Sequence, residues 1–150
     1  MKRSLVIGYG NPSRRDDGVG HYVVERLERL VGDKVDTLAL HQLGPELAET
    51  IKDYELIIFV DAHAGEHAEG LRVAPVKAAY RPSAFTHFMN PSSLLALAKS
   101  LYQKGPRAFT VSIRGYNFDF GTELSEGTRK YADGAVDRII EMITREFAQC

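Results

Sequence analysis

This sequence has only one cysteine, no long apolar run and no excess of either charge, and each of these features excludes a class of protein. Its single cysteine is Cys150, so no internal disulfide can form, and a thiol at the last residue is a poor catalytic nucleophile. No segment reads as a signal peptide or a membrane span, which predicts a cytoplasmic protein with no membrane partner. The 19 Lys and Arg residues balance 20 Asp and Glu residues without forming a basic stripe, so nucleic acid is not an expected partner.

Familiar nucleotide-binding and nucleophile motifs are also absent. Gly8 and Gly10 follow an apolar segment, but Ser13 stands where a dinucleotide fingerprint needs its third glycine. No Gly-Lys-Ser/Thr follows, which excludes a P-loop. No Gly-x-Ser-x-Gly occurs either, so nothing indicates the nucleophile elbow of a serine hydrolase.

Strand-like and helix-like patterns alternate along the 150 residues, which are enough for one domain with its own core over residues 1–150. The succession predicts an α/β fold: a three-layer α/β/α sandwich around a largely parallel, five-stranded twisted sheet. Pro75 favours an edge position for its strand, and Asn90-Pro91 predicts the capped start of a helix that Gly105-Pro106 ends. The expected strands are 4–7, 34–40, 55–61, 71–76 and 108–113; the expected helices are 19–31, 45–51, 91–104 and one from about residue 125.

The loop after the first strand is the most informative segment. It begins Gly8-Tyr9-Gly10-Asn11 and delivers Asp16 and Asp17 just before a helix. In open α/β sheets, ligands bind beyond the carboxyl ends of the strands, which is where this loop lies. We expect one aspartate to cap the helix, a common role for this residue type, and the other to face a ligand.

A candidate metal site combines this loop with two later segments. Asp61 ends the third strand, and His87 precedes the helix that starts at Pro91. First and third strands of such sheets are commonly neighbours, so Asp17 and Asp61 are expected at one rim, over which the loop of His87 can fold. Two carboxylates and an imidazole suit a divalent ion such as nickel or zinc. Alternatively, Asp61 accepts hydrogen bonds from loop amides and His87 is only a polar group at a helix entry.

The remaining histidines stay outside this ligand set. His63 follows Asp61 closely enough to line the pocket or support a ligand, but we expect strand alternation to point it in a different direction from Asp61. The others lie on a helix, after a strand or in a solvated loop: His21, His41 and His67.

Arginines flank the same region. Arg14 and Arg15, beside the acidic pair, are interpreted as solvated side chains rather than as guides for an anionic segment. Arg114, near the end of the fifth strand, has two interpretations: it reaches the rim, or it pairs with Asp119.

Several motifs, taken in order, resemble those of one enzyme family. Gly8-Tyr9-Gly10-Asn11 with Asp16-Asp17-Gly18-Val19-Gly20 resembles the opening signature of the hydrogenase maturation endopeptidases. Residues 57–62, and Thr86-His87 with residues 91–97, resemble their second and third motifs. Residues 111–115, 118–121 and 124–125 resemble the tail pattern of one branch. The resemblance covers nearly the whole chain, and the order of the motifs is more specific than any one of them.

The resemblance implies an endopeptidase that removes the C-terminal extension from the precursor of a [NiFe]-hydrogenase large subunit after nickel insertion, with the substrate's nickel as the recognition element. The family's metal-binding positions map onto Asp17, Asp61 and His87, although some members carry glutamate in place of Asp17. These three residues, with Asp16, are the expected catalytic residues. The nickel arrives with the substrate, and no organic cofactor is expected.

In the leading hypothesis, the three ligands grip the precursor's nickel, which polarises the scissile carbonyl or lowers the pKa of a water molecule. An uncoordinated carboxylate, Asp16 or Asp61, serves as the general base. Two alternatives keep the fold: a non-catalytic checkpoint that senses nickel loading, and an unrelated metallohydrolase with its own zinc. A checkpoint would be favoured if one of the acidic residues of the motifs were missing, and none is. A metallohydrolase would be favoured if the purified protein held zinc tightly.

Overall fold

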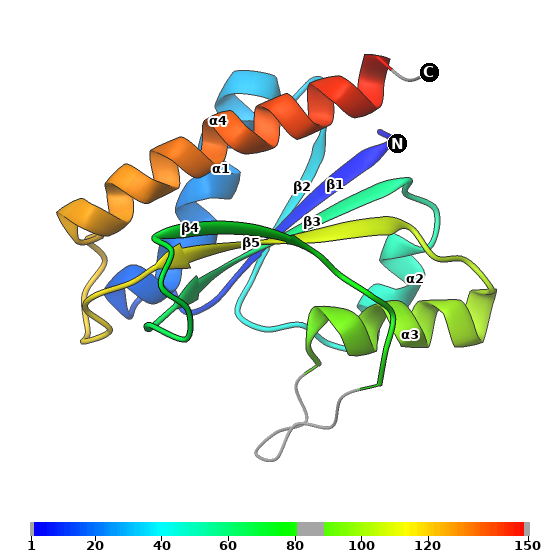
Figure 1. Cartoon of the computed structure of the whole chain (residues 1–150), viewed down its shortest axis with the longest axis horizontal. Helices are drawn as coiled ribbons and strands as arrows, with labels where there is room; N and C mark the ends of the chain where they lie inside the picture. Colours follow the sequence, from blue (N-terminus) through cyan, green and yellow to red (C-terminus); the bar gives the residue numbers. More distant parts are fainter. Residues whose placement is uncertain (1, 81–88, 149–150) are drawn as a thin grey trace.

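The fold is built on a mixed, five-stranded sheet (Figure 1). The computed structural model describes residues 2–80 and 89–148. The strands lie in the order β2-β1-β3-β5-β4, in which β4 is an edge strand antiparallel to β5 and the other pairs are parallel. In chain order the elements are β1 (Ser4–Tyr9), a 3₁₀ turn η1 (Arg15–Gly18), α1 (Val19–Val31), β2 (Asp36–Leu40), α2 (Leu47–Ile51), β3 (Leu56–His63), β4 (Leu71–Pro75), α3 (Pro91–Tyr102), β5 (Arg107–Arg114) and α4 (Glu126–Ala148).

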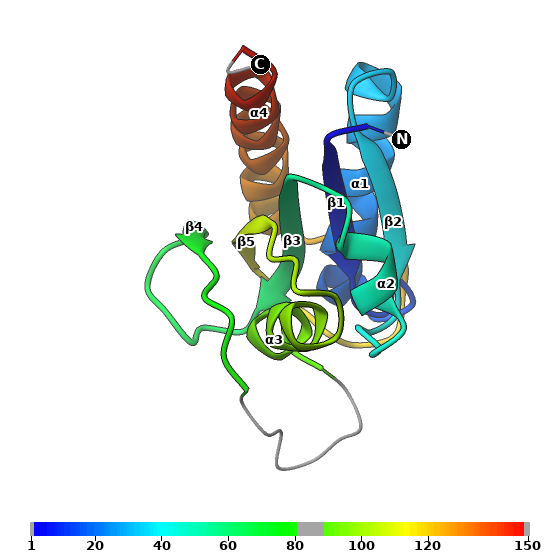
Figure 2. The same cartoon turned by 90° about the vertical axis from the view of Figure 1, so that its right-hand side faces the viewer.

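Helices cover both faces of this sheet, α1 and α4 on one side and α2 and α3 on the other (Figure 2). The core under α1 and α4 includes Val6, Ile58 and Val111, whereas the core over α2 and α3 includes Leu5 and Phe59. Alternate strand residues therefore enter opposite cores, as the pleat of a strand requires. The predicted three-layer α/β class, the largely parallel sheet and the edge position of the Pro75 strand are confirmed.

Two strands extend two residues further at their carboxyl ends than the sequence predicts. β1 continues to Tyr9 rather than Ile7, and β3 continues to His63 rather than Asp61. The extra residues of β3 pair with β5, with Asp61 opposite Ser112 and His63 opposite Arg114. Asp61 therefore lies inside a strand, so its neighbours in space are side chains of adjacent strands.

Helix α3 begins as predicted and ends earlier than predicted. The side chain of Asn90 accepts a hydrogen bond from the backbone N–H of Ser93 at 2.8 Å, and Pro91 is the first helical residue. The helix stops at Tyr102 because Gln103 adopts a left-handed conformation with φ of 56°, two residues before Gly105. Within the described part of the chain, no helix is long and apolar enough to cross a membrane.

Candidate metal centre

The amino end of α1 lies directly against the carboxyl ends of two strands. A Cβ atom at Gly8 would lie 2.2 Å from the carbonyl oxygen of Gly20, and one at Gly20 would lie 2.7 Å from the carbonyl oxygen of Val60. Side chains would prevent this approach, which explains the two glycines. The contact holds the loop 10–18, with its acidic residues, at the rim formed by β1 and β3.

Asp17 is fixed by the backbone of this loop. Its carboxylate accepts a 2.7 Å hydrogen bond from the N–H of Asn11. Gly10 has φ of +139°, and a Cβ atom there would lie 2.1 Å from the carbonyl oxygen of Asp17. The side chain is half-buried. One face of the carboxylate is thus held by the protein, and the residue is still open to a ligand.

Asp61 is held by side chains from the strands on either side of β3. The Tyr9 hydroxyl donates to one carboxylate oxygen at 3.0 Å, and the Ser112 hydroxyl donates to the other at 3.3 Å. The sequence analysis missed both donors, because each contact depends on strand register. Their positions in motifs are the sequence features that could have identified them: Tyr9 lies inside the Gly-x-Gly motif, and Ser112 lies in the tail motif.

The pKa of Asp61 is raised to about 6, chiefly because burial disfavours the charged carboxylate. The hydrogen bonds from Tyr9 and Ser112 oppose this rise, while the negative charges of Glu66 and Asp17 add to it. Burial and the nearby charge of Asp61 also raise the pKa of Tyr9 well above its ordinary value. Asp17 follows β1 and Asp61 lies near the carboxyl end of β3, and these strands are neighbours, so both carboxylates lie on one rim. A cation bound there relieves their repulsion, and this is the chemistry that a metal site requires.

Asp16 has a different environment from its neighbour. It is fully buried, and its carboxylate accepts hydrogen bonds from the N–H groups of Tyr116, Asn117 and Ser125 and from the Ser125 hydroxyl, at 2.7–2.9 Å. Neither η1 nor α1 has a side-chain cap. The expectation that one aspartate caps the helix is therefore wrong, because the loop 115–125 supplies better donors than the helix end.

These contacts decide what Asp16 can do chemically. Burial by itself raises its pKa, but the hydrogen bonds from Ser125, Tyr116 and Asn117 outweigh burial and the pKa is lowered. A carboxylate with four donors and a lowered pKa is a weak base that is closed to substrate. The geometry favours a structural role for Asp16: it joins the acidic loop to the loop that follows β5.

His87 lies outside the described residues, so its distance to the two carboxylates is not part of the structure. The segment just after it is placed by two contacts: the N–H of Met89 donates to the carbonyl of Leu43 at 3.2 Å, and Asn90 caps α3. Among residues 2–80 and 89–148, no three Asp, Glu, His or Cys side chains are grouped as a metal site. Any complete site therefore needs a ligand beyond these residues.

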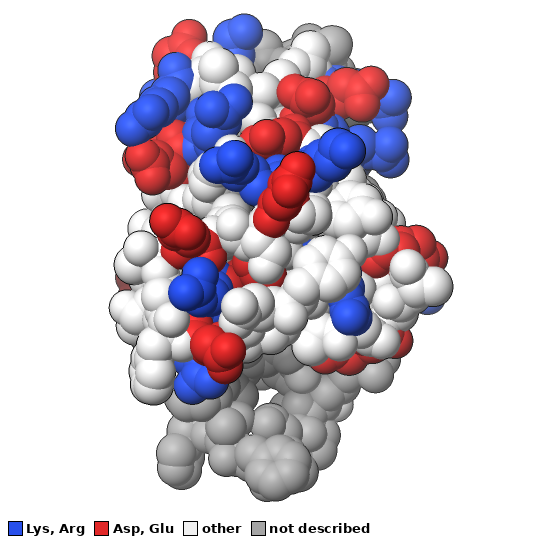
Figure 3. Space-filling view, turned by 90° about the vertical axis from the view of Figure 1, so that its left-hand side faces the viewer, with Lys and Arg blue, Asp and Glu red and all other residues white. Residues whose placement is uncertain are grey.

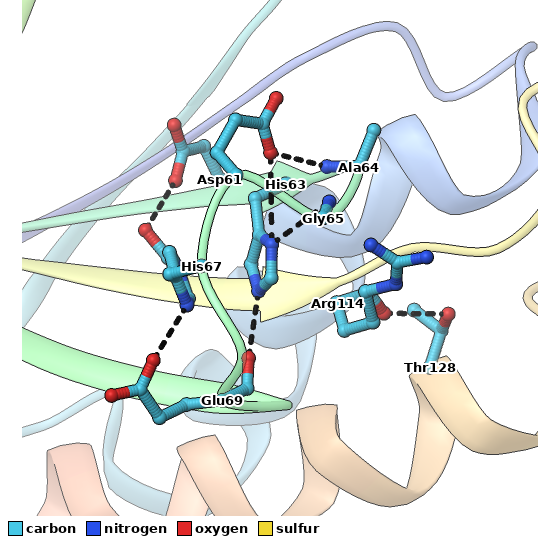
Figure 4. A network of polar contacts seen from close by, with 10 residues as sticks. Asp61, His63, Ala64, Gly65, His67, Glu69, Arg114 and Thr128 are labelled. Atoms are coloured by element: carbon cyan, nitrogen blue, oxygen red, sulfur yellow. Dashed lines mark hydrogen bonds and ion pairs between the residues drawn. The ribbon is translucent and has the colours of Figure 1, made fainter.

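The loop between β3 and β4 stacks two histidines beside Asp61 (Figure 4). The rings of His63 and His67 lie 3.6 Å apart between centroids, and each contacts Glu69, His63 through the backbone carbonyl and His67 through the carboxylate. The Nδ1 atom of His63 accepts a hydrogen bond from the N–H of Gly65. Both nitrogens of His63 are therefore occupied within the loop, which favours a structural role.

The expected orientation of His63 is wrong. Asp61 and His63 both belong to β3 and are two residues apart, and side chains two apart on a strand share a face. His21 also has a local role, because its Nε2 atom contacts the carbonyl oxygens of Gly10 and Leu40 at 3.0 Å. It joins the ends of β1 and β2.

The arginines near the rim are ordered by the loop after β5. Arg14 is exposed, and its Nε donates to the carbonyl of Phe118. Arg15 packs its guanidinium against Gly121. Among the described residues, Arg114 forms no ion pair with Asp119; its guanidinium lies over the ring of Tyr116, 5.1 Å from the centroid.

Comparison with known proteins agrees with this architecture. No model of a known protein family matches the chain. A protein of Methanocaldococcus jannaschii named as a hydrogenase maturation protease is 27% identical over 149 residues, which cover 97% of this chain and 96% of that protein. The fold is shared with the hydrogenase-maturating endopeptidase HybD of Escherichia coli, with a TM-score of 0.81, 20% identity and coverage of 97% of this chain and 94% of that chain.

Archaeal structures are similar as well. The hydrogenase 2 maturation peptidase of a Thaumarchaeota archaeon is 25% identical with a TM-score of 0.70, covering 95% of this chain and 98% of that one. The [NiFe] hydrogenase maturation protease HycI of Thermococcus kodakarensis is 24% identical with a TM-score of 0.75, covering 95% and 93%.

Proposed function

We propose that this chain is a peptidase of the hydrogenase maturation protease family and that it removes the C-terminal extension from the precursor of a [NiFe]-hydrogenase large subunit once nickel has been inserted. The observation that carries the proposal is the pair of carboxylates, Asp17 and Asp61, on the rim formed by β1 and β3. Each is held by the protein, and the raised pKa of Asp61 reflects a buried negative charge that a cation stabilises.

We assign the nickel-binding role to Asp17, Asp61 and His87. Carboxylate oxygens with one imidazole nitrogen form a suitable donor set for a divalent ion of borderline softness. The nickel belongs to the substrate, and its binding docks the scissile bond at the rim, where the ion supplies Lewis-acid polarisation of a carbonyl or a more acidic water. No organic cofactor enters this scheme.

The general base in this scheme is Asp61 rather than Asp16, through the carboxylate oxygen of Asp61 that does not bind nickel. A base must be reachable by water and must have a pKa near the working pH. Asp61, with its pKa raised to about 6, meets the second condition and is half-buried rather than enclosed. Asp16 meets neither condition, because four hydrogen bonds occupy its carboxylate inside the protein.

The test is incubation of the purified chain with candidate precursors, with and without nickel, followed by intact-mass measurement. We expect a loss of the extension from the nickel-loaded precursor only. Asp17→Ala, Asp61→Ala and His87→Ala should each abolish cleavage, while Arg29→Gln, in the last turn of α1, should cleave at the wild-type rate. Retained cleavage by all three alanine variants would refute the assignment.

Two further expectations accompany this function. We expect residues 1–150 to act as a single domain, since all five strands share one sheet whose two faces are each covered by helices. We also expect the peptidase to work in the cytoplasm, because its single cysteine is typical of a reducing compartment. Cell fractionation with an antibody to the chain tests the second expectation.

A further inference from the structure

Two arginines lie over two exposed aromatic rings on the loop that follows β5. The guanidinium of Arg114 lies 5.1 Å from the ring centroid of Tyr116, and that of Arg14 lies 5.5 Å from the centroid of Phe120. The rings are among the most exposed apolar groups described, with 54% of Tyr116 and 82% of Phe120 open to solvent. An exposed ring under a cation is a surface that a partner can cover.

In the part of the chain that the structure describes, neither guanidinium forms an ion pair with a carboxylate. Arg14 uses Nε to donate to the carbonyl of Phe118, which fixes the side chain without neutralising it. Figure 4 shows the guanidinium of Arg114 beside Gly65, while the contact with Thr128 uses the Arg114 backbone carbonyl. The Asp16 carboxylate, which this loop contacts, is already occupied by four hydrogen bonds.

Backbone hydrogen bonds join the loop that follows β5 to the segments that carry the candidate metal centre. The N–H of Gly115 donates to the carbonyl of His63 at 2.8 Å, and the N–H of Arg15 donates to the carbonyl of Gly121 at 2.8 Å. Arg114 also follows Ser112, the residue that donates to Asp61, by two positions on the same strand. The two side chains therefore share a face of the sheet, with Arg114 one step nearer the loop.

Figure 3 shows the molecule from the left-hand side of Figure 1; charged side chains of both signs gather in its upper part, and below them acidic and basic side chains are scattered among uncharged ones. An arginine without a carboxylate partner attracts an anion more strongly than one whose charge a carboxylate already neutralises.

We propose that Arg14 and Arg114, each backed by its aromatic ring, bind acidic side chains of the precursor's C-terminal extension beside the metal centre. A guanidinium offers a planar set of donors that matches a carboxylate, and stacking on a ring keeps one face dry and the side chain ordered. The proposal rests on the proposed function, because the precursor is the polypeptide that must lie along this rim.

Cleavage of the nickel-loaded precursor tests the proposal. We expect Arg14→Gln and Arg114→Gln together to raise KM about tenfold, with kcat unchanged, because the contact positions the substrate and does not react. Arg114→Lys keeps the positive charge but lacks the planar guanidinium, so its KM should lie between those of the wild type and Arg114→Gln. Arg29→Gln, an equal change of charge on α1, should leave KM unchanged. Added salt should raise the KM of the wild type more than that of the double variant.

A precursor whose extension has Asn and Gln in place of Asp and Glu should show the same rise in KM with the wild-type enzyme, and no further rise with the double variant. A wild-type KM for the folded double variant overturns the proposal, as does an unchanged KM for the neutralised precursor. Binding of a fluorescent extension peptide, measured by anisotropy, separates the two claims. If the wild type binds the acidic peptide more tightly than the double variant but cuts no precursor, the proposed function fails and the docking surface stands.

Discussion

Tyr9 at the end of β1 donates its hydroxyl to Asp61 in β3, so that the two strands that carry the candidate centre are joined by side chains as well as by backbone. Burial disfavours the charged form of this carboxylate, and the hydrogen bond from Tyr9 opposes that effect. It stabilises the charged form of Asp61 and orients the oxygens toward the rim.

Replacement of Tyr9 by phenylalanine removes one donor to this carboxylate. We expect the pKa of Asp61 to rise above about 6, and the acidic limb of the cleavage rate to move to higher pH. The free energy of unfolding should fall by about 1 kcal/mol. Tyr54→Phe is the matched control, because the Tyr54 hydroxyl bonds Asp36 at 2.6 Å far from the site and its loss should leave the pH profile in place. Equal profiles for wild type and Tyr9→Phe would contradict the assigned role.

The raised pKa of Asp61 also means that its ionisation lowers the free energy of unfolding at neutral pH. The folded state holds the proton up to about pH 6, whereas the unfolded chain loses it near pH 4, so this group's stabilisation is full below pH 4 and disappears as the pH rises through about 6. The difference corresponds to about 3 kcal/mol. Asp61→Asn should therefore melt at a higher temperature than wild type at pH 7.5, and the gap should close at pH 4.

Asp16 has the opposite dependence on pH. The pKa of Asp16 is lowered in the folded protein. Its contribution to the free energy of unfolding is therefore present above the ordinary aspartate pKa and is lost as the pH falls below about 4. We expect Asp16→Ala to lower the free energy of unfolding by about 3 kcal/mol or more, because it leaves buried N–H groups without an acceptor. Asp119→Ala, on the exposed part of the same loop, should cost little. Urea unfolding at pH 7 provides the comparison, and equal midpoints would show that the Asp16 contacts contribute nothing.

Two glycines in helices predict opposite effects of alanine. A Cβ atom at Gly20 meets the backbone oxygen of Val60 at 2.7 Å, so Gly20→Ala must push α1 away from the strand ends and should lower stability by about 2 kcal/mol. At Gly134 in α4 the nearest atom, from Leu71, is 3.8 Å away, and alanine should add about 1 kcal/mol through helix propensity. Thermal unfolding of both variants checks the signs. A stabilised Gly20→Ala variant would mean that α1 does not need this close approach.

The features that could be predicted from the sequence depend on local patterns. The apolar run in β3 indicates a strand covered on both faces, and Asn90-Pro91 indicates a capped helix start. The shared rim of Asp17 and Asp61 follows from the order of parallel strands rather than from any short motif.

What sequence reasoning missed depends on contacts between distant residues. Tyr9 and Ser112 reach Asp61 only because the register of β1, β3 and β5 aligns them. The partners of Asp16 lie 100 or more positions further along the chain, so no local pattern distinguishes it from Asp17. The metal-binding role of Asp17, Asp61 and His87 stays a prediction.

The separation between Asp16 and its donors has a consequence for biosynthesis. Tyr116, Asn117 and Ser125 leave the ribosome about a hundred residues after the acidic loop, so the Asp16 carboxylate lacks its hydrogen-bond donors until most of the polypeptide has been made. A nascent chain that stops before residue 115 retains both adjacent aspartates but lacks the scaffold that separates their roles. We therefore expect the acidic loop to reach its final geometry only after the tail of the chain has packed against it.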